Sequence, residues 1–233
     1  MYSLVYYLIS SVAGYLLIKD TSYFPTWLGG SGHCLNFYTN APELAEATLA
    51  MKVFYIIQFG KHLSRMLSHM FLHQEGNYYE YILHHALSIF LIGFSFLMNM
   101  WLIGILVLLI HDLSDFFLIS ARAYRVIVLL MQDYRHYSKN FLKVIYVLAV
   151  AAWIGCRLVI FNICCVYSGL YGAFYYVPQF LNEIETEIMW YSYLFMSVMM
   201  AALEVLHLFW TYYIFSSFIS VNVSEKMAKH NYD

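Results

Sequence analysis

Long apolar runs, interrupted by short polar segments, dominate this chain of 233 residues. A membrane-spanning helix needs about 20 consecutive, mostly apolar residues at ~1.5 Å rise each. Windows of that kind lie at residues 1–18, 48–70, 79–98, 100–120, 143–167 and 188–216. The pattern therefore predicts an all-α, polytopic membrane protein, a bundle of six transmembrane helices with little chain outside the bilayer.

Composition and segment lengths narrow the class of protein further. Only 11% of the residues are charged, where a soluble domain carries roughly 25%. A net charge of −2 with no long basic run argues against a nucleic-acid-binding protein. No connection between the windows is long enough for a second domain, so residues 1–233 are expected to form one domain. The first window lacks a basic leader and a cleavage site, and we expect a retained span rather than a signal peptide.

Lysine and arginine are divided unevenly between the two sides of the predicted bundle. The side that holds both termini has nine of them, and the opposite side has only Lys19 and Lys52. Positive residues accumulate in cytoplasmic loops. We therefore expect both termini in the cytoplasm, or in the matrix if the membrane is mitochondrial.

Ionisable residues interrupt two adjacent windows. They are His84 and His85 in the third window, and His111, Asp112 and Asp115 in the fourth. Inserting each such side chain costs roughly 2.5–3.5 kcal/mol, which makes a cluster of them a candidate functional site. Counted at ~1.5 Å per residue from the turn near Asn99, both groups reach a depth of about 20 Å, nearer the cytoplasmic face. We predict that they share a polar intramembrane cavity reachable from that face.

Histidines beside carboxylates suit general acid and base chemistry, because imidazole titrates near neutrality. Acyl transfer to an amine or hydroxyl fits this set. The residues do not have a standard zinc spacing, so we expect no bound metal and keep a metal-dependent lipid hydrolase or hydroxylase as a third hypothesis. Buried His and Asp also pair simply to hold helices together. We prefer this structural explanation for any one of the residues taken alone. Five such residues at the same depth favour a functional site instead.

Further polar residues lie close to the predicted cavity. Glu204 and His207, three residues apart in the last window, are expected to line it and bind substrate. Arg157, another candidate for substrate binding, lies ~21 Å from the cytoplasmic end of its window. This depth separates it from the cluster and suggests a structural or headgroup-binding role. The cytoplasmic end of the second window forms either a snorkelling interfacial face or an anion site for a phosphorylated substrate, and its residues are Lys61, His62, Arg65 and His69.

The polar motifs also resemble those of a known family. The double histidine at 84–85 and the His-Asp-x-x-Asp at 111–115, in adjacent spans, resemble the signature of ceramide synthases within the wider TLC-domain family. Residues 54–58, 157–160 and 206–210 add further matches. The likeness covers about residues 51–210.

This resemblance implies N-acylation of a sphingoid base, with acyl-CoA as co-substrate and no bound cofactor. It assigns catalytic roles to His84, His85, His111, Asp112 and Asp115. It also implies an endoplasmic reticulum membrane protein that contacts lipids, with the mitochondrial inner membrane as the alternative location. Other members of the family look like translocon, cargo-receptor or lipid-regulating proteins. The alternative function is therefore a non-catalytic subunit or lipid-binding scaffold of a larger membrane assembly with protein partners.

Overall fold

A computed structural model describes residues 2–39, 47–72, 78–130, 135–176 and 183–230. Throughout these ranges the regular structure is helical, which confirms the all-α class. The principal helices are α1 (Tyr2–Ile18), α3 (Leu49–Leu72), α4 (Tyr78–Leu97), α5 (Trp101–Leu130), α6 (Arg135–Trp153) and α9 (Glu183–His230). Each predicted window overlaps one of them or a direct continuation of it.

Four described helical segments are long and apolar enough to cross a bilayer. They are Tyr78–Leu97, Trp101–Ile127, Phe141–Tyr175 and Met189–Ser216. The first helix, Tyr2–Ile18, is also apolar but shorter. These segments make the chain an integral membrane protein of helical type.

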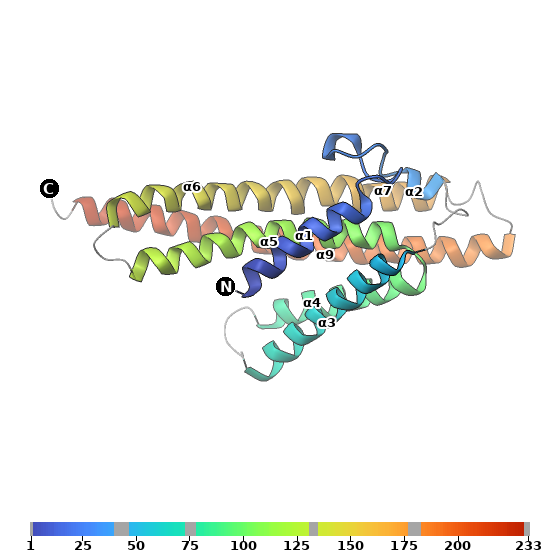
Figure 1. The fold of residues 1–233 in the computed structure, drawn as a ribbon, viewed down its shortest axis with the longest axis horizontal. Helices are drawn as coiled ribbons and strands as arrows, with labels where there is room; N and C mark the ends of the chain where they lie inside the picture. Colours follow the sequence, from blue (N-terminus) through green and yellow to red (C-terminus); the bar gives the residue numbers. More distant parts are fainter. Residues whose placement is uncertain (1, 40–46, 73–77, 131–134, 177–182, 231–233) are drawn as a thin grey trace.

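Helix α5 lies at the centre of the bundle (Figure 1). It packs against α1 on one side and against the antiparallel α6 on another, while α3 pairs with α4 as a tilted hairpin. The long α9 runs beside α4 and beside the continuation of α6. Side chains from α1, α3, α4, α6 and α9 therefore converge on α5.

A tight turn joins α4 to α5 and sets their relative height. Asn99 has a φ of 55°, the left-handed region that Asn tolerates better than most residues. The hydroxyl of Tyr55 on α3 donates to the carbonyl oxygen of Trp101 at 3.1 Å. A Cβ on Gly104 would lie 1.7 Å from that hydroxyl, so glycine is required there. Together these contacts hold α3 against the α4–α5 hairpin.

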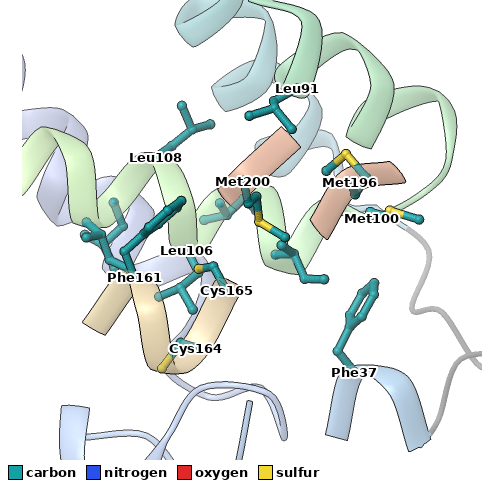
Figure 2. Packing of buried hydrophobic residues seen from close by; sticks show 14 of the residues in the cluster. Phe37, Leu91, Met100, Leu106, Leu108, Phe161, Cys164, Cys165, Met196 and Met200 are labelled. Atoms are coloured by element: carbon teal, nitrogen blue, oxygen red, sulfur yellow. The ribbon is translucent and has the colours of Figure 1, made fainter. Parts of the chain in front are cut away.

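The apolar core fills the space between α5, α9 and the continuation of α6. Figure 2 shows Leu106 of α5 close to Phe161 and Cys165, whereas Leu108 lies on the side of α5 that faces Leu91. Methionines are flexible and fill irregular gaps well, and α9 contributes Met196 and Met200 here. The short helix α2 (Asn36–Thr39) places Phe37 at the edge of the same core.

Helix α6 continues without a break into π-helical turns. These are η3 (Ile154–Ile160), η4 (Asn162–Tyr167) and, after the single α-turn α7 (Ser168–Tyr171), η5 (Gly172–Tyr176). Arg157 and Asn162 are five residues apart and would diverge on an α-helix of about 3.6 residues per turn. The wider π-helical turn, with its i to i+5 hydrogen bonding, brings them closer to one face. Both side chains point to the cluster described below.

Candidate functional site

Asp112 is buried in a closed set of hydrogen bonds. Its side chain is 1% exposed. One carboxylate oxygen accepts from the hydroxyl of Ser10 and the amide of Gln58, and the other accepts from the ammonium of Lys61 at 2.6 Å. That ammonium also lies 4.4 Å from the centre of the Tyr7 ring. Three helices, α1, α3 and α5, are thus joined through one carboxylate.

Asp115, one helical turn further along α5, has an open environment. Its side chain is 28% exposed, and it forms an ion pair with the guanidinium of Arg157. The Nε of Arg157 donates to the hydroxyl of Ser114 at 2.8 Å, and the guanidinium lies 4.4 Å from the Trp153 ring centre. These contacts hold Arg157 in one orientation while leaving part of Asp115 accessible.

His84 stands out because its Nδ1 atom is buried without a hydrogen-bond partner. The residue is 7% exposed. Its ring lies 4.9 Å from that of Trp210, edge to face, and 6.2 Å from that of His111, stacked. Aromatic neighbours therefore fix the ring while one ring nitrogen stays unpaired.

A second set of hydrogen bonds runs behind His84, from α5 to α9. His111 Nδ1 contacts the carbonyl oxygen of Val107 at 2.7 Å, and its Nε2 lies 3.0 Å from Nε2 of His207. His207 Nδ1 lies 3.0 Å from Glu204, whose other oxygen accepts from the amide of Asn162 at 2.7 Å. The remaining histidines form a pair, with Nδ1 of His62 3.2 Å from Nδ1 of His85.

A cavity of about 530 Å³ is lined by residues of α1, α3, α4, α5, α6, η3 and α9. Three histidines line it, namely His62, His84 and His85. Its wall also holds five cationic side chains, namely Lys61, Arg65, Arg122, Arg125 and Arg157. Asp115 is the only carboxylate in the described wall. The cavity is therefore strongly cationic around one acid.

A much smaller apolar cavity, of about 30 Å³, also has His62 in its wall. It holds roughly one water molecule. His111 forms part of its wall, together with Met196 and Met200. Ser95 and Gly104 mark its far end, near the turn between α4 and α5.

Comparison with known proteins decides the family. The family model described as TLC domain matches residues 1–216. The chain belongs to the TLC-domain family.

Curated relatives of this TLC-domain protein include ceramide synthases from several animals. It is similar to ceramide synthase 4 of Mus musculus, with 25% identity over 88% of this chain and 46% of the relative. Ceramide synthase 3 of Homo sapiens is 26% identical over 90% of this chain and 48% of its own length. Ceramide synthase hyl-1 of Caenorhabditis elegans is 25% identical, with coverages of 90% and 53%. The chain spans about half the length of the curated relatives it matches.

The TLC domain brings the candidate residues of the sequence together but distributes them over different environments. His84, His85 and Asp115 line the large cavity, whereas His111 lines the small one. Asp112 lies in neither described wall and is enclosed by its partners. Glu204 and His207 lie behind His111 rather than in the wall of the large cavity.

The expectation that Arg157 lies away from the cluster is wrong, because it pairs with Asp115. Side chains on a helix tilt toward its N-terminus. Since α5 and α6 are antiparallel, Asp115 and Arg157 lean toward each other along the bundle. Depth counted from backbone positions alone misses this convergence.

Several partners in the site were not singled out from the sequence, namely Ser10, Ser114 and Asn162, and Gln58 was noted only within the family match at residues 54–58. Gln58 and His62 are four residues apart and share a buried face of α3, so the helical spacing of polar residues was an available signal for that face. Lys61 and His62, expected to be either interfacial or anion-binding, contact Asp112 and His85 and also line the large cavity. No group of three metal-ligating side chains converges in the described residues, so the metal-dependent hypothesis finds no ligand set there.

Proposed function

We propose that this chain is a ceramide synthase-like N-acyltransferase, which moves a fatty acyl group from acyl-CoA to the amine of a sphingoid base. Its similarity to ceramide synthases supports the reaction class. The observation that carries the proposal is the unpaired Nδ1 of His84, a buried atom of a residue that lines the same cationic cavity as Asp115. Buried polar atoms without partners are rare in proteins and require an explanation.

In the proposed mechanism, His84 is the general base. A base must lie within hydrogen-bond reach of the proton that it removes. Nδ1 is buried in this conformation, so in this mechanism the entering substrate displaces the side chains that cover it, and the substrate amine becomes the partner that Nδ1 lacks. As the amine nitrogen attacks the thioester carbon, His84 takes one amine proton. The carbon–sulfur bond then breaks, and His84 returns that proton to the departing thiolate.

Asp115 and Arg157 are assigned complementary roles in this mechanism. Asp115 attracts the amine of the sphingoid base, since it is the only carboxylate in the described wall. Arg157 lies where it can stabilise negative charge that develops on the thioester oxygen, a contribution that is often large in a site shielded from water. Its bonds to Asp115 and Ser114 hold the guanidinium in place beforehand.

The distribution of cations suits a phosphorylated acyl donor. Arg122 and Arg125 lie seven and ten residues beyond Asp115 on α5, or roughly 10 and 15 Å along the helix. In acyl-CoA, the flexible pantetheine arm separates the thioester from the phosphates. We place the thioester near His84 and the phosphates near the two arginines.

The small apolar cavity suits the start of the acyl chain. It holds about 30 Å³, so a chain longer than a methyl group or two needs the surrounding residues to move. Met196 and Met200 line it, and methionine changes rotamer more readily than branched side chains.

For the membrane context, we propose six spans, with a polar intramembrane cavity and both termini in the cytoplasm. The asymmetry of lysine and arginine supports this orientation, as does the position of Arg122 and Arg125 at the end of α5 remote from the Asn99 turn. The resemblance to ceramide synthases favours the endoplasmic reticulum, with the mitochondrial inner membrane as the alternative.

One observation favours a second function, that of a non-catalytic subunit or lipid-binding scaffold in a larger membrane complex with protein partners. Most ionisable residues of the cluster are paired with each other, as in Asp112 with Lys61 and His62 with His85. Internal pairing of this kind also serves to hold helices together. The unpaired nitrogen of His84 distinguishes the two functions, because a scaffold gains nothing from it.

The test is N-acylation of a sphingoid base by the full-length protein in lipid nanodiscs, with isotopically labelled acyl-CoA. His84→Ala should reduce the rate by ~10²–10⁴-fold, the range for loss of a general base. His33→Ala is the matched control, since His33 is exposed outside the cluster, and it should retain wild-type activity. A folded wild-type protein that forms no ceramide would reject the enzyme and favour the scaffold.

A further inference from the structure

The hydrogen bonds between α5, α9 and η4 form an unbroken chain that is buried at its two central contacts and part-buried at its two ends. It runs from the carbonyl of Val107 through His111, His207 and Glu204 to Asn162, with consecutive distances of 2.7, 3.0, 3.0 and 2.7 Å. Within it, His207 is fully buried and Glu204 is 8% exposed. At this burial each contact must be a hydrogen bond with a proton in it, because unsatisfied polar atoms are costly.

Counting those protons determines the charge of the group. A backbone carbonyl only accepts, so His111 Nδ1 carries a proton. One proton lies between the two Nε2 atoms, and one lies between His207 Nδ1 and Glu204. Three protons are needed, whereas two neutral imidazoles supply only two. Two neutral imidazoles and a carboxylate carry one negative charge, and the third proton cancels it. The trio of His111, His207 and Glu204 is therefore neutral as a whole.

The third proton has two possible places, on Glu204 or on one of the imidazoles. An imidazolium and a carboxylate together would bury two charges, each with a desolvation cost. The guanidinium of Arg157 already lies 3.4 Å from the carbonyl oxygen of His111, so an imidazolium would add a second cation nearby. Glu204 and His207 both belong to α9. The charged or titratable groups that face them from neighbouring elements are His84 of α4, His111 of α5, Arg157 of η3 and Cys165 of η4.

We infer that Glu204 is a positioning residue that acts as a neutral carboxylic acid, donating its proton to His207 Nδ1. His207 then carries its own proton on Nε2 and donates it to His111, whose remaining proton is on Nδ1. Both imidazoles are uncharged and each has a defined tautomer. The functional part of this inference rests on the proposed acyl transfer.

The consequence for catalysis is electrostatic. The ring centre of His84 lies 6.2 Å from that of His111 and 6.5 Å from that of His207. A positive charge on either ring would oppose protonation of His84 across a low-dielectric interior. A neutral trio leaves His84 able to accept the amine proton, while the chain of hydrogen bonds holds the wall behind it.

The protonation states are tested directly on the wild-type protein. Histidine ring nitrogens labelled with ¹⁵N are observed by solid-state NMR in lipid bilayers, about two pH units above the ordinary histidine pKa. Exposed histidines are neutral there, and we expect no imidazolium signal. Infrared spectra should show the carbonyl band of a protonated carboxylic acid that is lost in Glu204→Gln. The inference would be overturned if the wild-type protein shows an imidazolium signal at this pH and the Glu204→Gln variant does not.

Activity provides the second readout through a matched pair of variants. In Glu204→Gln the amide nitrogen donates to His207 and the amide oxygen accepts from Asn162, so no extra proton is needed. We expect it to stay within about 5-fold of wild type with an unchanged pH profile, less than the net value of one hydrogen bond. Glu204→Ala leaves both partners unpaired and should lose ~30-fold or more.

The possible outcomes separate the two proposals. If Gln is as damaging as Ala while the protein remains folded, Glu204 works as a charged or proton-transferring group, and the neutral-acid inference fails. If no variant and no wild-type preparation acylates a sphingoid base, the proposed function fails. The NMR and infrared results still decide the state of Glu204 in that case, because neither requires turnover.

Discussion

Asp112 and Asp115 belong to one short motif on one helix, yet their surroundings differ. Asp112 is 1% exposed, and both its oxygens are occupied by groups from α1 and α3. Asp115 is 28% exposed and faces a cavity of about 530 Å³ with Arg157 as its ion-pair partner. Three residues correspond to roughly 300° of rotation on an α-helix, a net offset of about 60° around it, and this offset directs one carboxylate into the helix packing and the other into the cavity.

The difference shows that a shared motif does not imply a shared role. An enclosed carboxylate with saturated oxygens cannot bind a substrate without losing its partners. An accessible carboxylate with one fixed partner can. We therefore assign Asp112 to holding the bundle together and Asp115 to the reaction, and the predictions below test this division.

The largest effect is expected for Asp112→Ala. The substitution leaves the ammonium of Lys61 buried without its counter-ion, which typically costs about 3–5 kcal/mol. The free energy of unfolding, measured by denaturant titration in mixed micelles, should fall by that amount. The double variant Asp112→Leu with Lys61→Met should recover most of the loss, because no uncompensated charge remains. If Asp112→Ala alone is as stable as wild type, the hydrogen bonds of Asp112 do not stabilise the fold.

Asp115→Asn should have the opposite profile. The side chain keeps its shape but loses its charge, so we expect kcat/KM to fall by ~10²–10³-fold, as when one electrostatic contact to a transition state is removed. The free energy of unfolding should fall by only about 1–3 kcal/mol, because the asparagine oxygen can still accept from Arg157 and the bond from Arg157 to Ser114 remains. Steady-state acylation rates and unfolding curves on the same preparation check both. Full activity in a folded Asp115→Asn protein would contradict the division.

The smallest effect is expected from the pair Arg122→Gln and Arg125→Gln at the cationic end of the cavity. KM for acyl-CoA should rise about 3–10-fold at low salt and converge with wild type at high salt, because exposed charges are screened. With an acyl-pantetheine donor, which lacks the nucleotide phosphates, the variant should match wild type. Lys19→Gln, on the opposite side of the bundle, is the control. An unchanged KM for acyl-CoA at low salt would place the phosphates elsewhere.

Much of the helical architecture was predictable from hydrophobicity alone. The window at residues 79–98 matches α4, Tyr78–Leu97. An apolar run in lipid forms a helix because its backbone polar groups must hydrogen-bond to each other. The ends of α5 and α6 were not predictable in this way. Residues 121–130, which include two arginines among apolar side chains, and the more polar residues 135–142 continue as helix beyond the apolar windows.

The candidate residues were predictable as a group, because ionisable side chains in apolar windows are conspicuous. Their division into separate environments was not predictable, because it depends on partners from other helices. Nothing near Asp112 in the sequence indicates Ser10, 102 residues away. Arg157 was misplaced because the direction of its side chain, and not only its depth, decides its contacts.

The π-helical turns that follow α6 have a consequence for sequence variation. Arg157 and Asn162 reach Asp115 and Glu204 from a backbone wound more loosely than an α-helix. Removing a single residue between Arg157 and Asn162 would rotate everything after it by roughly a quarter of a turn and separate these two contacts. The number of residues in this stretch is therefore under stronger constraint than the identity of its lipid-facing side chains, and deletions there should be far less tolerated than apolar substitutions.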